Sequence, residues 1–419
     1  MESIFKKYMK GDPVIWAVFI ILCGLSIVEM YSASSTLAYK AASYTDPVMK
    51  HAMFLGLGIL IVFMIQFLKL FQIRILAYVG ILISIVLLIL VMFKGHSEND
   101  ATRWISIAGI QFQPSEIAKL SLIILVADFL SRIKNNKTDE SLYFRLTIIF
   151  TGIVCLLILF ENFSTAFLLF MVVFVLMFVG NISLKKLGLI IAALLVVGLL
   201  SYGLIKLFPE KTKTPENTSA SAEKSKPKLF HRVYTWVGRF EDHFGKDSTE
   251  TSKYEITDDN LQVQHGKIAI AKGGLLGVFP GNSVERDFLP QAYSDFIYAI
   301  IIEETGMAGG IFVILLYLIL LFRAGTLATK SPTVFPAIMV IGLSLMLVTQ
   351  SFMNMAVATS LIPVTGQPLP LISRGGTSII VTCIYFGLIL AITRQLKEDS
   401  NKSSAEEKDM VVVDLEELK

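Results

Sequence analysis

Long stretches with few or no charged residues recur along this chain, and most are long enough to cross a lipid bilayer as a helix. A spanning helix needs about 20 apolar residues to cross a hydrocarbon core about 30 Å thick. Hydrophobic residues make up 54% of the 419 residues and charged residues only 17%, against roughly 25% in soluble proteins. Soluble domains cannot bury that much apolar surface, so we predict an all-α, polytopic membrane protein. The candidate spans that stand alone are residues 14–28, 52–68, 75–93, 187–205, 334–362 and 377–393, with 117–130 as a more polar one.

Two further apolar regions have lengths that decide the number of spans. Residues 146–180 would form about 52 Å of helix, nearly twice the hydrocarbon thickness, so this region must turn, and the polar pair Glu161 and Asn162 marks the turn. Residues 296–322 would form about 40 Å, which one tilted helix accommodates. We therefore predict about ten transmembrane helices.

The basic residues of the short loops divide unequally between the two sides of this arrangement. Fifteen lysines and arginines fall on the side of the N-terminus and five on the other. Because short cytoplasmic loops are enriched in basic residues, we predict that both termini are cytoplasmic. The first apolar stretch also resembles a secretory signal, but we interpret it as a retained span because nine more follow.

The spans divide the chain into four parts. Residues 1–208 hold seven helices, 209–293 form one large extracytoplasmic loop, 294–394 hold three helices, and 395–419 form a polar, acidic cytoplasmic tail. Within the loop, 209–228 is of low complexity and is predicted to be a disordered linker. Apolar residues at helical spacing between Phe230 and Phe244 predict a helix that lies on the outer leaflet or packs on the protein's own loops. The tail is a solvated segment or a short partner-binding helix.

Charge and cysteine content exclude other classes. The net charge is only +3, and no basic run is interleaved with aromatic residues, which argues against nucleic acid binding. Cys23, Cys155 and Cys383 all lie in apolar runs, so neither a disulfide framework nor a CxxC metal site is expected.

Charged residues near membrane depth are costly and are therefore candidates for function. A first cluster, residues 103–119, leads from an outer loop into the fourth span. Glu116 and Lys119 are three residues apart and share a helical face. A structural ion pair explains them as well as a binding site does, and Arg103 beside Trp104 could equally anchor the protein at the lipid headgroups.

A second cluster, residues 273–306, ends the large loop and leads into the eighth span. Asp295 falls at the start of that helix, where a carboxylate could act chemically or could merely favour the helix dipole by about 0.3–1 kcal/mol. Glu303 and Glu304 lie roughly 12 to 14 Å deeper along the helix. Two adjacent carboxylates at that depth need partners, water or protonation.

A third cluster, residues 354–378, interrupts an apolar region with prolines and glycines. Irregular backbone at membrane depth must line a cavity or be buried in protein. Free N–H groups, hydroxyls and an arginine at the start of a helix would suit an anion. The residues that would form this anion cradle are Ser373, Arg374, Gly375, Gly376, Thr377 and Ser378.

Together, the three clusters resemble the SEDS family of bacterial cell-wall polymerases, which includes FtsW, RodA and SpoVE. The matching motifs occur in family order and are RWI with QPSE and AK, then LP with SDFIY and EE-x-G, then P-x-TG with LP-x-x-S-x-GG-T-S. The resemblance implies a ten-span fold in the bacterial cytoplasmic membrane and polymerisation of lipid II on its outer face. It also implies a class B penicillin-binding protein as partner, other divisome membrane proteins nearby, and an essential aspartate at Asp295.

The chain departs from the family pattern in several places. A PDLGT-like stretch is replaced by ENFST at 161–165, a usual lysine by Arg286, LPEAHTDF by LPQAYSDF at 289–296, and a usual glycine by Ser360. These differences indicate a divergent branch with the same activity. The shared motifs do not separate division (FtsW-like) from elongation (RodA-like), and we favour division.

The reaction implied by the resemblance is attack of a sugar 4-hydroxyl on the anomeric carbon of a donor that carries polyprenyl pyrophosphate. Asp295 is expected to be the general base, or to hold a divalent cation such as Mg²⁺ or Mn²⁺. The candidates for binding substrate, and its pyrophosphate above all, are Arg103, Glu116, Lys119, Arg286, Ser373, Gly375, Gly376 and Ser378.

Two alternatives from other classes stay open at this point. A flippase or transporter would also use intramembrane charges and broken helices, but its charges should lie near the midplane. A noncatalytic scaffold would leave the charged outer cluster without a role.

Overall fold

The computed structural model describes residues 9–33, 45–94, 96–98, 101–107, 110–135, 140–207, 260–289 and 292–417. The helices of this part of the chain are α2 (Pro13–Ala33), α4 (Asp46–Ile65), α5 (Leu70–Lys94), α6 (Pro114–Asn135), α7 (Glu140–Leu159), α8 (Phe163–Val179), α9 (Leu184–Leu207), α11 (Leu261–Gly273), α12 (Glu285–Phe288), α13 (Ile297–Thr329), α14 (Val334–Ala358) and α15 (Gly376–Glu417). The strands are β1 (His96–Glu98), β2 (Ala101–Ile107) and β3 (Ile110–Phe112). The predicted linker at 209–228 and the predicted helix between Phe230 and Phe244 lie outside the described residues.

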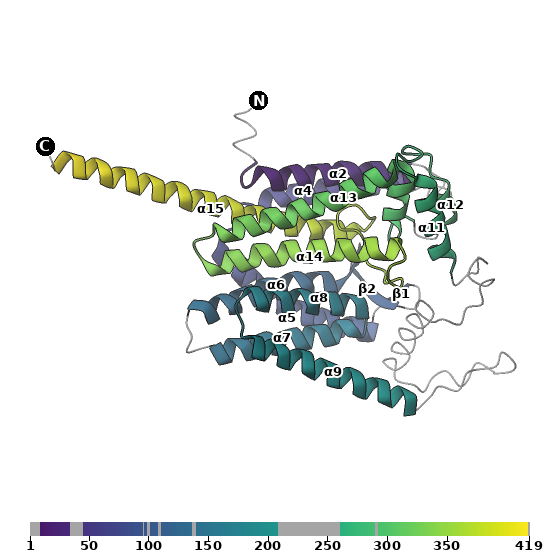
Figure 1. Ribbon diagram of the computed structural model, residues 1–419, viewed down its shortest axis with the longest axis horizontal. Helices are drawn as coiled ribbons and strands as arrows, with labels where there is room; N and C mark the ends of the chain where they lie inside the picture. Colours follow the sequence, from purple (N-terminus) through teal and green to yellow (C-terminus); the bar gives the residue numbers. More distant parts are fainter. Residues whose placement is uncertain are drawn as a thin grey trace.

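The long helices run side by side along one direction, and each predicted span corresponds to one of them (Figure 1). Within the described residues, seven helices are long and apolar enough to cross a membrane, and α8 is a shorter apolar helix of 17 residues. The more polar α6 carries Glu116, Lys119 and Asp128 and is nonetheless buried over most of its length. The prediction of a helical polytopic membrane protein is confirmed.

The turn predicted inside the 146–180 region is present. Helix α7 ends at Leu159 and α8 begins at Phe163. Asn162 caps α8, because its side-chain oxygen accepts hydrogen bonds from the backbone N–H groups of Ser164 (3.0 Å) and Thr165 (3.4 Å). A side-chain acceptor at this position satisfies helix N–H groups that have no partner within the helix.

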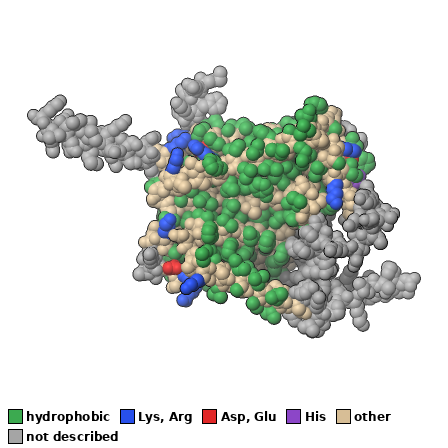
Figure 2. Space-filling model, viewed as in Figure 1, with side chains coloured by type: hydrophobic (Ala, Val, Ile, Leu, Met, Phe, Trp, Pro, Cys, Tyr) green, Lys and Arg blue, Asp and Glu red, His purple; other side chains and the backbone are tan. Residues whose placement is uncertain are grey.

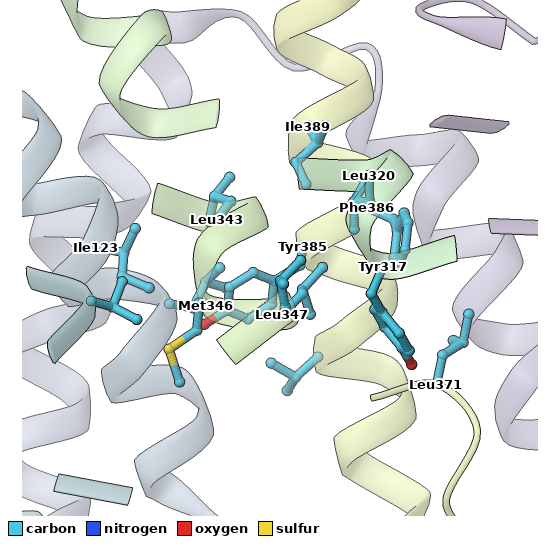
Figure 3. Close-up of a cluster of buried hydrophobic side chains, with 14 of the residues drawn as sticks. Ile123, Tyr317, Leu320, Leu343, Met346, Leu347, Leu371, Tyr385, Phe386 and Ile389 are labelled. Carbon is cyan, nitrogen blue, oxygen red and sulfur yellow. The ribbon is translucent and has the colours of Figure 1, made fainter. Parts of the chain in front are cut away.

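The centre of the bundle is formed by α6, α14 and α15. Helices α14 and α15 each have 72% of their most apolar segment buried, whereas the corresponding fractions for α4 and α7 are 22%. Tyr385 of α15 lies beside Met346 of α14 in this core, and Phe386 lies beside Tyr317 and Leu320 of α13 (Figure 3). The outer helices instead expose apolar side chains, which cover the middle of the molecule, while lysines and arginines gather toward its ends (Figure 2). This pattern is the one that a surrounding bilayer requires.

Two features differ from the simple ten-span picture. The connection from α5 to α6 contains a small antiparallel sheet in the order β1-β2-β3. Helix α15 does not end with the apolar span near Thr393 but continues to Glu417, so most of the predicted tail is helical. Figure 1 shows this extension leaving the bundle at the end opposite to α11 and α12.

Candidate active site

Asp295 lies in a turn that leads directly into α13. The helix begins at Ile297, with Phe296 as its N-cap residue. Asp295 is partly exposed, and the hydroxyl of Ser294 donates a hydrogen bond to its Oδ1 at 3.0 Å. The predicted position of this carboxylate at the start of the eighth span is confirmed to within two residues.

The loop between α14 and α15, residues 359–375, holds the turn in place. Ser373 donates from Oγ to the carbonyl oxygen of Ser294 at 2.7 Å and accepts a bond from the Leu369 N–H, also at 2.7 Å. The backbone N–H of Arg374 donates to the carbonyl oxygen of Tyr293 at 2.9 Å. The Arg374 guanidinium lies 5.1 Å from the centre of the Tyr293 ring. The second and third sequence clusters therefore meet at Asp295.

Asn354 of α14 joins the same two segments from beneath. Its buried side-chain amide donates to the carbonyl oxygens of Asp295 (2.9 Å) and Gln367 (2.8 Å). Asn354 is the first residue of the third cluster, and no role was predicted for it. Its signal in the sequence is a polar side chain in a largely apolar helix, a signal that it shares with Gln350 and Ser351.

The first cluster connects to this loop through an ion pair. Lys119 is completely buried, and its Nζ lies 2.7 Å from Oε1 of Glu116 and 3.0 Å from Oε1 of Gln350. The Gln350 amide in turn donates to the carbonyl oxygen of Pro368 at 3.2 Å. The structural ion pair between Glu116 and Lys119 is thus present, and it also supports the loop that holds Asp295.

Helix α15 begins at Gly376, inside the predicted anion cradle. Gly375, Gly376 and Ser378 are each partly exposed, and the Thr377 hydroxyl donates to the carbonyl oxygen of Gln111 in β3 at 3.2 Å. The N–H groups of a first helical turn have no partner within the helix, and the positive end of the helix dipole lies with them. This terminus directly follows the Arg374 that stacks on Tyr293, so a positive site adjoins the turn that carries Asp295.

Arg286 of α12 lies in a different set of contacts. Its Nη1 donates to the backbone oxygen (3.1 Å) and hydroxyl (2.9 Å) of Ser32, at the end of α2, and lies 4.0 Å from Oε1 of Glu304. These partners give Arg286 a structural position, while its binding to substrate stays a prediction.

Glu303 and Glu304, which were expected to need partners, water or protonation at this depth, both have hydrogen-bond partners. Glu303 accepts hydrogen bonds from the Ser283 hydroxyl at 2.5 Å and the Val284 N–H at 3.1 Å. Glu304 accepts from the Ser32 hydroxyl and from the Gly281 N–H at 3.2 Å. Both carboxylates are fully buried and hold the end of the large loop against α13.

Comparisons with known proteins agree with this arrangement. The model of the FtsW/RodA/SpoVE family, described as "cell cycle protein", matches residues 12–398. The chain belongs to this family. It is 29% identical over 406 residues to a probable peptidoglycan glycosyltransferase FtsW of Enterococcus hirae, with 94% of this chain and 95% of the relative covered. It is 31% identical over 407 residues to a protein of the same description from Aromatoleum aromaticum, with 92% and 89% covered.

Solved structures of FtsW/RodA/SpoVE-like proteins have the same fold. One comes from work described as "Structural coordination of polymerization and crosslinking by a peptidoglycan synthase complex", with a TM-score of 0.68, 25% identity, and 92% of this chain and 98% of that chain covered. The rod shape determining protein RodA of Thermus thermophilus matches with a TM-score of 0.59 at 24% identity, with 93% and 98% covered. As an FtsW/RodA/SpoVE family member, the chain is an integral membrane protein.

Two further predictions about the site concern Arg103 and a metal ion. Arg103 lies on β2, but its side chain is outside the described part of the structure. Among the described residues, no group of three or more histidine, cysteine, aspartate or glutamate side chains could hold a metal ion. A divalent cation on Asp295 therefore stays a prediction from chemistry alone.

Proposed function

We propose that this protein is a peptidoglycan glycosyltransferase that polymerises lipid II into glycan strands on the outer face of the cytoplasmic membrane. The observation that carries the proposal is the placement of Asp295. Hydrogen bonds from Asn354 and Ser373 clamp the turn that bears this carboxylate. The names of the curated relatives support the reaction class.

The proposed reaction joins the acceptor's 4-hydroxyl oxygen to the donor's anomeric carbon. As this bond forms, the bond from the anomeric carbon to the polyprenyl pyrophosphate breaks, and the configuration inverts. Asp295 takes the hydroxyl proton, because a positioned carboxylate can act as general base and typically contributes 10²–10⁴ in rate. The Ser294 hydroxyl orients Oδ1 at 3.0 Å.

The leaving pyrophosphate needs positive charge or N–H donors. The start of α15 supplies N–H groups at Gly376 and Ser378, and Arg374 supplies a cation beside Tyr293. Lys119 is a weaker candidate for direct contact, since it is completely buried and already paired with Glu116. Lys119 instead contributes to substrate binding indirectly, because it supports the loop that presents Arg374 through Gln350.

We assign the division role and a class B penicillin-binding protein as partner. The division role is supported by relatives named FtsW, with RodA-like elongation as the alternative. The partner is supported by the structural neighbour from a peptidoglycan synthase complex that couples polymerisation with crosslinking. We also propose contacts with other divisome membrane proteins, and cytoplasmic termini on the basis of the basic residues.

The experiment that tests the function uses purified protein, its penicillin-binding partner and lipid II. Asp295→Asn retains the shape of the side chain but removes its charge and basicity, so the polymerisation rate should fall by at least about 10². Asp287→Asn, which changes an exposed carboxylate of the neighbouring α12, is the matched control and should polymerise normally.

The outcomes separate three roles of Asp295. Near-normal glycan synthesis by Asp295→Asn would contradict both catalytic roles and would leave the helix-dipole role, worth at most about 1 kcal/mol of stability. Activity restored by higher Mg²⁺ or Mn²⁺ would favour metal binding over the general base. Lipid II transport across vesicles by a variant that cannot polymerise would favour the flippase alternative.

A further inference from the structure

The end of the large loop forms a hairpin that lies along the first part of α13. Helix α11 runs beside that part of α13, because Gly266 lies against Phe296 and Gly273 against Ile302. The chain then reverses and returns through α12. Lys272 and Glu285 form an ion pair across the two arms. We call residues 273–284, which lie between these two charges, the hairpin tip.

The hairpin tip is inserted into a break in α13. Gly306 has φ 72° and ψ −176°, so the helical hydrogen bonds across it are lost. The N–H groups of Met307 and Ala308 instead donate to the carbonyl oxygens of Gly274 (2.9 Å) and Leu275 (3.3 Å). In exchange, the carbonyl oxygens of Glu303 and Glu304 accept from Val278 (2.9 Å) and Phe279 (2.8 Å). Four backbone bonds therefore fix the tip at the level of the break.

The level of the break can be estimated from the opposite end of α13. Arg323 pairs with Asp12, which lies just before the start of α2, and so marks one membrane boundary. Ala308 lies 15 residues from Arg323, or roughly 22 Å along a helix, whereas the hydrocarbon core is about 30 Å thick. The tip is therefore at membrane depth, in the half of the bilayer away from Arg323.

The side chains of the tip are apolar and largely exposed within the described structure. Leu275, Leu276 and Phe279 are 71%, 74% and 72% exposed, and no charged residue occurs in 273–284. These side chains continue an exposed apolar surface of α13 that includes Met307 (48%) and Ile311 (52%). The charged residues of the hairpin, in contrast, lie on its arms. This division matches a segment whose tip faces lipid and whose arms face the headgroups and water.

We propose that the hairpin tip is a membrane anchor whose Leu275, Leu276 and Phe279 contact lipid acyl chains. Non-helical backbone is tolerated at membrane depth when protein groups satisfy it, as the four exchanged bonds do here. The anchor holds both sides of the α13 break, and Asp295 lies just before the short helical arm that ends at this break. This inference concerns the lipid contact and does not depend on the proposed reaction.

The test measures the surroundings of a nitroxide at Leu276→Cys in the full-length protein in vesicles of phosphatidylethanolamine and phosphatidylglycerol. Oxygen collects in the bilayer, and a nickel chelate stays in water, so the ratio of the two collision rates reports depth. Matched labels are Ile311→Cys, on the lipid-facing surface of α13, and Asp287→Cys, on the exposed side of α12. The wild-type cysteines, two of them buried, set the background.

The Leu276→Cys label should give a ratio close to that of Ile311→Cys and several-fold above that of Asp287→Cys. A ratio like that of Asp287→Cys would place the tip in water and overturn the proposal. Low collision rates with both reagents would show that protein covers the tip, from another part of this chain or a second copy, and would also overturn it. The same measurement with the penicillin-binding partner added shows whether the lipid contact persists in the complex.

Discussion

Lys119 shows how one residue can support a site without facing it. Its ammonium group is completely buried, and Glu116 and Gln350 supply its hydrogen-bond acceptors. Removing a charge from water costs several kcal/mol, and the attraction to a partner roughly offsets that cost. The pair therefore contributes little net stability, but the loss of one member leaves the other charge buried and uncompensated.

This reasoning predicts the result of a double-mutant cycle. Lys119→Met should lower the free energy of unfolding by about 3–5 kcal/mol, because Glu116 would keep its charge without a partner. The double variant Lys119→Met/Glu116→Gln should recover much of that loss. Thermal unfolding in detergent measures both. The cycle also needs Glu116→Gln alone. If the losses of unfolding free energy of the two single variants summed to that of the double variant, the pair would not be coupled.

At the scale of single elements, α13 depends on close backbone contact at its break. A Cβ atom on Gly306 would lie 2.2 Å from the Leu275 carbonyl oxygen, and one on Gly277 would lie 2.2 Å from that of Glu304. Both glycines also have positive φ angles, 72° and 76°. These two positions therefore need glycine for space as well as for backbone conformation.

Alanine substitutions along α13 should separate the break from an ordinary helical position. Gly306→Ala should destabilise the protein by at least about 1–3 kcal/mol from backbone strain, with the collision adding to this. Gly325→Ala, where a Cβ meets nothing within 4 Å, should be neutral or stabilise by about 0.5–1 kcal/mol. Equal melting temperatures for the two variants would contradict the close packing at the break.

An ion pair also links two helices. Asp12, just before the start of α2, pairs with Arg323 of α13. Asp12 accepts hydrogen bonds from Nε (3.0 Å) and Nη2 (2.7 Å) of Arg323, and from the Val14 N–H (3.0 Å) at the start of α2. Burial raises the pKa of Asp12, but the bonds and charge of Arg323 and the backbone N–H bonds outweigh it and lower the pKa overall.

A lowered pKa makes this contribution to stability dependent on pH in a defined direction. The stabilisation is fully present above the unfolded pKa of about 3.9 and is lost as the pH falls through the lower folded pKa. Asp12→Asn should therefore reduce stability at pH 7 by about 1.5–3 kcal/mol, and by less below about pH 4. Melting temperatures of both proteins across this range provide the measurement. A difference that does not change with pH would rule out the charge as its cause.

At the scale of the whole molecule, the bundle has two chemically different ends. The α11–α12 hairpin lies at one end, together with the small sheet, and the end of α6 and the start of α7 lie at the other (Figure 1). The distribution of basic residues predicts that the second end is cytoplasmic.

Labelling of engineered cysteines tests this orientation. Asp287→Cys should react with a membrane-impermeant maleimide added to spheroplasts, and Ser141→Cys, exposed near the start of α7, only in inverted vesicles. The unmodified protein controls for its own cysteines. Reaction of both positions from the same side would contradict the predicted arrangement of spans.

Local sequence alone determined the spans and the turn at Glu161 and Asn162. It also offered an ion pair of Glu116 with Lys119 as one of two interpretations, and a helix start within residues 373–378. Each depends on residues close in the chain, through hydrophobic length, capping or helical spacing. The sequence also showed that Glu303 and Glu304 needed partners.

Only the tertiary structure decided which partners meet. Ser32 reaches Glu304 across 272 positions, and Asn354 reaches the backbone of Asp295 across 59. The break at Gly306 was predicted as part of one continuous helix, because nothing local indicates that a distant turn will replace its hydrogen bonds. Such bonds depend on how helices pack, and packing brings together segments whose separation in the sequence carries no local signal.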